Sequence, residues 1–246
     1  MNKKTLYWIT GIIAAVLILF IAWFFLKSDS TTEHGTHNGN HGNVTENTTG
    51  SSSKDDTADT KDNDKNKKLA SYMEEQNEVM DEMMDDMHDV EPTGYAALDF
   101  LIGMIPHHEA AVDMSESYLE YGGTNEELKK LAQNIIEVQE KEITEMKKMA
   151  ETLEAQGKQD TEKEQAYLKE YEKMFSSHAH MNHGTQDNVE AAFAEGMIMH
   201  HQMAVDMAQA ILPNTEEEQV LALAQNIIDS QNQEIQQMKD ILREVG

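Results

Sequence analysis

Two short segments of this sequence carry the same residues with metal-binding chemistry. Residues 100–114 read FLIGMIPHHEAAVDM and residues 193–207 read FAEGMIMHHQMAVDM, with ten of fifteen positions identical at an offset of 93. Residues three, four, seven and ten apart lie on one stripe of an α-helix, so each segment is expected to gather thioethers and imidazoles on one face. Adjacent histidines are about 100° apart on a helix, so we expect only one of each pair to point fully inward. The candidate ligands are Met104, His107, His108, Met114, Met197, His200, His201 and Met207.

A second duplicated segment follows each of these. Residues 131–146 read LAQNIIEVQEKEITEM and residues 223–238 read LAQNIIDSQNQEIQQM, at an offset of 92. Helical spacing predicts that Met146 and Met238 approach the histidine-bearing face from across a hairpin. Glu142 and Glu234 lie beside them and are placed to hold the second nitrogen of a histidine, as carboxylates around metal ligands commonly do.

Two further clusters combine methionine with histidine. The segment MDEMMDDMH supplies Met83, Met87 and His88, and the segment HAHMNH supplies His178, His180, Met181 and His183. Each feature also has a structural interpretation, because methionine at helical spacing commonly fills a core and a buried histidine commonly satisfies hydrogen bonds there. The repetition of the His-His pair with flanking methionines favours metal binding by the chain as a whole.

The donor types indicate which metal would bind. Thioether sulfur is a soft, neutral donor and imidazole is of borderline softness, so the set favours copper, as Cu(I) or Cu(II), with silver as an alternative, over magnesium or calcium. The sequence has no cysteine and therefore no thiolate ligand. It also has no nucleophilic triad, phosphate-binding glycine loop or nucleotide fingerprint. We therefore expect a binding protein and not an enzyme.

Helices must position these residues. From Leu69 onward the sequence consists mainly of good helix formers without alternating β-branched runs. Glu91 to Gly94 and Gly122-Gly123 predict helix ends, and Thr124 with Glu127 predicts a capping box, as does Thr215 with Glu218. The expected fold is an all-α, ferritin-like four-helix bundle made of two repeated hairpins, each with a preceding helix. The predicted helices span residues 69–89, 94–121, 124–156, 161–177, 188–211 and 215–244.

The chain divides into four expected parts. Residues 1–27 are predicted to be a transmembrane anchor, because Leu6 to Leu26 is an uncharged run long enough to cross a bilayer; a cleaved signal peptide is the competing interpretation. Residues 28–68 are polar and are predicted to be a disordered linker, with His34, His37 and His41 as weak metal donors. The two hairpin units are expected at 69–157 and 158–246, forming one bundle.

Charge and topology limit the partners. The chain has 46 Asp and Glu against 19 Lys and Arg, which argues against nucleic acid as a partner and would concentrate cations near the surface. Lys3 and Lys4 precede the apolar run and Lys27 follows it, so the N-terminus is expected in the cytoplasm and the C-terminal domain outside the membrane. The absence of cysteine fits an extracytoplasmic domain. The expected partners are metal ions, the cell membrane and a protein that exchanges metal with this one.

The sequences GMIPHHEAAVDM and GMIMHHQMAVDM, each followed by an AQNII helix, resemble the bacterial family known as domain of unknown function 305. That family is ferritin-like in fold and includes CopM-like periplasmic copper-binding proteins. The resemblance covers residues 69–246 and implies a role in copper binding or copper tolerance. It also implies that the eight histidines and methionines of the two duplicated segments are the motif positions.

Two other functions compete with copper binding. A ferritin-like di-iron oxidase or peroxidase would use Glu-x-x-His pairs, yet none of the eleven histidines has a glutamate three residues before it. A surface scaffold, in which the histidines only satisfy hydrogen bonds in the core, is the other alternative.

Overall fold

The computed structural model describes residues 57–178 and 186–245, and every regular element in these two ranges is helical. The predicted anchor and the linker histidines His34, His37 and His41 lie outside them. No helix within the described ranges has the length and apolar character needed to cross a membrane. The elements are α2 (Thr57–His88), α3 (Ala96–Tyr121), α4 (Glu126–Gln156), α5 (Thr161–His178), α6 (Val189–Ile211), the 3-10 helix η1 (Leu212–Asn214) and α7 (Glu218–Val245).

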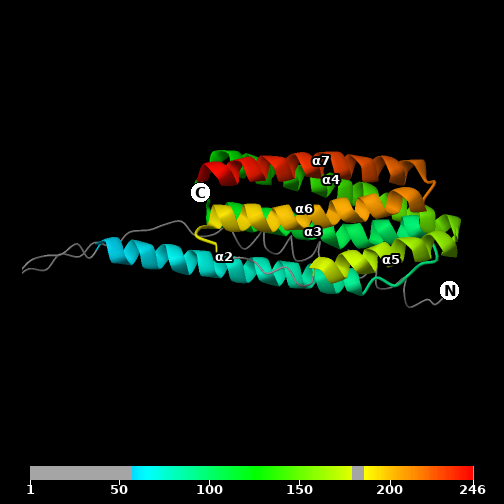
Figure 1. Cartoon of the computed structure of the whole chain (residues 1–246), viewed down its shortest axis with the longest axis horizontal. Helices are drawn as coiled ribbons and strands as arrows, with labels where there is room; N and C mark the ends of the chain where they lie inside the picture. The colour runs from blue at the N-terminus through cyan, green and yellow to red at the C-terminus, as the bar shows by residue number, and fades with distance from the viewer. Residues whose placement is uncertain (1–56, 179–185, 246) are drawn as a thin grey trace, which may run out of the picture. The chain divides into compact units, whose positions relative to one another are not determined.

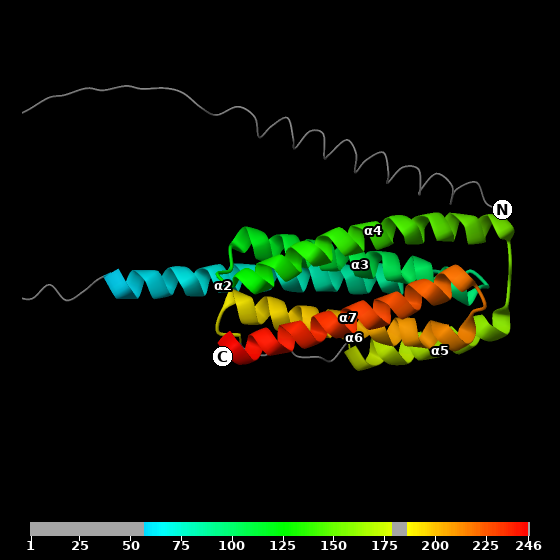
Figure 2. The same cartoon turned by 90° about the horizontal axis from the view of Figure 1, so that it is seen from above.

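Four of these helices form a bundle, as predicted. Helix α3 packs against α4 and α6, α7 packs against α6 and α4, and α2 and α5 run alongside α3 and α6 (Figure 1). Seen from above, the hairpin α3–α4 and the hairpin α6–α7 lie next to each other (Figure 2). The two histidine-bearing helices, α3 and α6, are therefore in direct contact at the centre.

Helix α2 begins at Thr57, well before the predicted start at Leu69. Helix α2 therefore includes residues 57–68, which the sequence analysis assigned to the linker. This stretch contains neither glycine nor proline, the two residues that most strongly disfavour a helix interior.

The predicted capping boxes are also wrong in detail. Asn125 caps α4, because its Oδ1 accepts hydrogen bonds from the backbone nitrogens of Glu127 and Leu128 at 3.0 and 2.9 Å. Thr124 instead donates from its backbone nitrogen and hydroxyl to Glu190 Oε1, at 2.5 and 2.9 Å. A short amide reaches the first free N–H groups of a helix well, so Asn125 takes the capping position while Thr124 ties α4 to α6.

Thr215 departs from its predicted box in a similar way. Its hydroxyl accepts from the backbone nitrogen of Glu217 at 3.1 Å, two residues along and not three, and α7 begins at Glu218.

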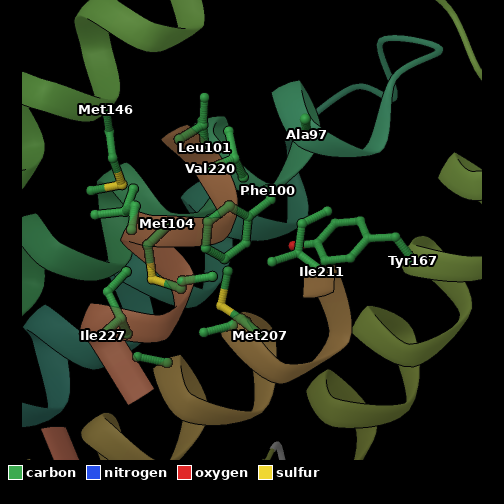
Figure 3. Packing of buried hydrophobic residues seen from close by; sticks show 14 of the residues in the cluster. Ala97, Phe100, Leu101, Met104, Met146, Tyr167, Met207, Ile211, Val220 and Ile227 are labelled. Atoms are coloured by element: carbon green, nitrogen blue, oxygen red, sulfur yellow. The ribbon is translucent and has the colours of Figure 1, made fainter. Parts of the chain in front are cut away.

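Buried side chains form two apolar clusters along the bundle. The first cluster, part of which is drawn in Figure 3, contains Phe100, Leu101, Met104, Met146 and Met207 among others. The second contains Met114, Tyr118, Phe193, Met197 and Met238 among others. Methionine is thus a principal component of both clusters.

Candidate functional site

All four paired histidines, His107, His108, His200 and His201, have no exposed surface. The prediction that only one of each pair points inward is therefore wrong. Helices α3 and α6 each have packed neighbours on more than one side, so a residue 100° from the first inward position still meets another helix.

His107 and His200 face each other where α3 meets α6. Their ring centroids are 3.7 Å apart, with 38° between the planes. His107 Nε2 lies 3.1 Å from the backbone oxygen of His200, and His200 Nε2 lies 2.9 Å from the backbone oxygen of His107. A carbonyl oxygen can only accept, so each Nε2 must carry the proton and each Nδ1 must carry a lone pair when the ring is neutral.

Electrostatics keep these two rings neutral. Burial, followed by the repulsion of neighbouring imidazoles, holds the pKa of His107 and of His200 well below the usual histidine value. Protons therefore compete weakly for their Nδ1 atoms at neutral pH.

His108 and His201 turn toward the companion helices. His108 Nε2 lies 2.9 Å from Glu142 Oε2 on α4, and His201 Nε2 lies 2.8 Å from Glu234 Oε2 on α7. The predicted contact between these glutamates and a histidine is present in both copies. A carboxylate on one ring nitrogen fixes the orientation of the ring and raises the donor strength of the other nitrogen.

The remaining ring nitrogen, Nδ1, is buried and has no hydrogen-bond partner in any of the four histidines, within the part of the chain that the structure describes. Leaving a buried polar atom unpaired costs about 1–3 kcal/mol. Such an atom in a native protein commonly marks a functional role or a bound ion. In each of the four rings, the bond at Nε2 leaves the lone pair of Nδ1 available. Four such lone pairs fit metal ligation.

The sequence predicts that the methionines of each duplicated segment lie on one helical face, but the structure distributes them between the two core clusters. Met104 and Met207 share the first cluster with Met146 (Figure 3), whereas Met114 and Met197 share the second with Met238. Each duplicated segment therefore contributes one methionine to each cluster. All six thioethers are at most 1% exposed.

At two glycines, a methionine of the other duplicated segment lies close to the backbone. A Cβ atom added at Gly103 would lie 3.7 Å from Met207 Cε, and one added at Gly196 would lie 3.4 Å from Met114 Cε. Gly103 and Gly196 are equivalent positions of the two segments. The same approach of a methionine to a glycine is thus made twice.

The methionines and the histidine of the cluster predicted on α2 lie on different faces of that helix. Met83 and Met87 are 2% and 1% exposed and belong to the first core cluster. His88 is exposed, with its ring centroid 5.9 Å from that of Phe175. His178 ends α5, and its side chain, together with His180, Met181 and His183, lies outside the described residues.

Two polar residues in the core were not predicted as part of the site. Gln139 and Gln231 are each 2% exposed, and both atoms of each side-chain amide have no hydrogen-bond partner among the described residues. They lie one helical turn before Glu142 and Glu234 on the same faces. The sequence did contain a sign of them, because both copies have an uncharged polar residue within the apolar face of this helix.

In the part of the chain that is described, no three histidine, aspartate or glutamate side chains gather closely enough to hold a metal ion. The donors that share the core with these imidazoles are thioethers. Met104 lies one turn before His108 on α3, and Met146 lies one turn beyond Glu142 on α4.

Comparison with known proteins gives one family. The model of the family described as Domain of unknown function (DUF305) matches residues 43–150 and again residues 97–242. No curated protein matches the chain.

The similar solved structures include several forms of CopM. The Ag-bound form obtained by soaking is 36% identical over 61% of this chain and 97% of that chain, with a TM-score of 0.47. The Cu(I)-bound form is 36% identical over 60% of this chain and 96% of that chain, with a TM-score of 0.46. The Cu(II)-bound form is 34% identical over 61% and 97%, with a TM-score of 0.47.

Proposed function

We propose that this chain, which belongs to the DUF305 family, binds copper in the interior of its helical bundle. The observation that carries the proposal is the set of four buried Nδ1 atoms without partners. The opposite nitrogen of each of these rings is occupied by a carbonyl or a carboxylate.

The proposed ligands form two sites. The His108 site consists of His108 with the thioethers of the first cluster, and its outer carboxylate is Glu142; the His201 site consists of His201 with the thioethers of the second cluster, and its outer carboxylate is Glu234. His107 and His200 lie between them. The thioethers are Met104, Met146 and Met207 for the His108 site and Met114, Met197 and Met238 for the His201 site.

The chemistry of these donors supports copper, with Cu(I) favoured. Thioether and neutral imidazole ligands add no charge, so a monovalent ion is less costly to bury among them than a divalent one. Silver(I), which has the same charge and softness, should occupy the same sites. CopM, which is 34–36% identical to this chain in the matched regions, has been captured with Cu(I), Cu(II) and Ag.

The proposed role is copper sequestration, tolerance or transfer outside the cytoplasm. The support is the uncharged run of residues 6–26 and the acidic composition of the chain, which would attract cations to an exposed domain. Protease treatment of intact cells should digest the C-terminal domain; protection of the domain until the membrane is broken would place it inside.

Anaerobic titration of the full-length chain with Cu(I) against a competing chelator tests the metal assignment. We expect uptake of two or more equivalents, abolished when His107, His108, His200 and His201 are all replaced by alanine. Gln202→Ala, at an exposed position next to His201, serves as the control and should bind like the wild type.

Thermal unfolding separates this function from a scaffold. A ligand that binds only the native state raises the melting temperature, so Cu(I) or Ag(I) should raise it in the wild type. Indifference of the melting temperature to copper, silver, zinc and iron would favour the scaffold. Selective uptake of iron with oxygen consumption would favour an oxidase.

A further inference from the structure

The two proposed sites differ at one outer contact, although their His–Glu pairs use the same atoms. Glu234 Oε1 accepts a hydrogen bond from Asn134 Nδ2 at 3.3 Å, while its Oε2 holds His201. In the other half, Glu142 is bonded to His108 alone among the described residues. Asn226 is equivalent to Asn134 at the offset of 92, and both residues are exposed, but only Asn134 makes a bond to the glutamate of the other hairpin.

This contact crosses between the two hairpins. Asn134 lies on α4 of the first hairpin, and Glu234 lies on α7 of the second. Asn134 also lines a groove of about 690 Å³ between these helices, whose other lining residues include Glu127, Asp240 and Glu244. Both oxygens of the Glu234 carboxylate therefore have a partner, and one of these partners, Asn134, lines a groove that also contains Lys130.

A carboxylate held at both oxygens positions its histidine more strictly than one held at a single oxygen. A free glutamate side chain loses rotamer freedom when it must fix an imidazole. At Glu234 that freedom is already restricted before a metal arrives. Carboxylates one shell beyond the ligands, as Glu234 is here, typically change metal affinity by about 10–100-fold when they are replaced. Asn134 acts one contact further out, through Glu234.

We propose that Asn134 is a positioning residue that makes the His201 site the tighter of the two, so that it fills first. The inference rests on the proposed function, because it assumes that both sites take up Cu(I). It predicts that the two sites fill in a fixed order. The His201 site should retain copper, and the His108 site should exchange it more readily, although the two halves are nearly identical.

Single-site backgrounds of the full-length chain test this. His108→Ala leaves the His201 site, and His201→Ala leaves the His108 site. In the first background, adding Asn134→Ala should weaken Cu(I) binding about ten-fold, whereas the matched control Asn226→Ala should leave it unchanged. In the second background, neither substitution should matter.

Spectroscopy provides a measurement that does not depend on replacing a ligand. Ring-nitrogen resonances of His108 and His201 can be followed while Ag(I) is added to the otherwise unaltered chain. We expect His201 to respond first in the wild type and this order to be lost in Asn134→Ala. A merely structural role for Asn134 would lower stability without changing the order.

The outcomes separate the two proposals. Equal affinities in the wild type, or an equal loss at both sites on replacing Asn134, would overturn the inference and leave copper binding in place. If the wild type takes up neither Cu(I) nor Ag(I), the proposed function fails and the inference falls with it.

Discussion

Individual side chains in the centre of the bundle perform structural and chemical tasks together. The His107 and His200 rings stack, and each Nε2 bonds to the backbone of the other residue. The same bonds that join α3 to α6 leave both Nδ1 atoms without a proton. Stability and ligand chemistry are thus coupled at these two residues.

Replacing His107 by alanine should lower the free energy of unfolding by about 2–4 kcal/mol, because it opens a cavity beside His200 and leaves the backbone oxygen of His200 without this donor. Urea denaturation of the metal-free protein measures the change. Gln202→Ala, at an exposed position, should change it by less than about 0.5 kcal/mol. A similar small change for both variants would contradict the structural role of the ring pair.

Asp99 predicts a pH dependence of stability. Burial raises its pKa to about 6, with nearby Glu164 acting in the same direction and hydrogen bonds from Thr93 opposing it. Because the pKa is higher in the folded than in the unfolded protein, the contribution of Asp99 to stability is fully present below about pH 4 and is lost as the pH rises through about 6.

The variant Asp99→Asn should remove that dependence. Asparagine can still accept the hydrogen bond from Thr93, so the variant should be more stable than the wild type above pH 6 by about 1–3 kcal/mol, since one pKa unit corresponds to about 1.4 kcal/mol. Urea unfolding at several pH values checks this, with Asp81→Asn on the exposed face of α2 as the control. A gap between wild type and Asp99→Asn that stays constant with pH would refute the assignment.

At the scale of elements, the turn between α3 and α4 requires one glycine for space. A Cβ atom at Gly123 would collide with the hydroxyl and ring of Tyr118. That ring is stacked on Phe193 with centroids 4.4 Å apart, so it cannot yield without disturbing the second cluster. At Gly103, in contrast, the nearest atom to an added Cβ is 3.4 Å away.

Gly123→Ala and Gly103→Ala should therefore differ in their effect on the free energy of unfolding. We expect Gly123→Ala to destabilise the fold by about 1–3 kcal/mol through overpacking, and Gly103→Ala to be neutral or to stabilise α3 by up to about 1 kcal/mol through helix propensity. Thermal and urea unfolding of the two variants provide the comparison. Equal losses in both would show that the space at Gly123 is not what matters.

Helix identity was predictable from the sequence, while the distribution of ligands between helices was not. The duplicated segments and the glycine and proline positions placed the four bundle helices within a few residues. The pairing of Met104 with Met207, and of Met114 with Met197, depends on how α3 and α6 meet. Likewise, Asn134 reaches Glu234 only through the packing of α4 on α7, which no local pattern encodes.

At the scale of the whole molecule, the formal charge of −27 predicts sensitivity to salt. Repulsion among surplus carboxylates opposes the compact state and is screened by added ions. Raising sodium chloride from about 10 to about 200 mM should therefore raise the melting temperature by several degrees, as measured by calorimetry. A fall in melting temperature would mean that surface ion pairs outweigh the repulsion.

The reciprocal contact of His107 with His200 also bears on the ancestry of the chain. A residue that touches its own counterpart, with the same atoms used in both directions, is the mark of an isologous interface in a symmetric dimer. Here that interface lies within one polypeptide, between equivalent positions of two duplicated hairpins. The bundle therefore has the organisation of a homodimer joined into one chain, yet the halves are not held to exact symmetry: Asn134 contacts Glu234, while the equivalent Asn226 makes no such contact with Glu142.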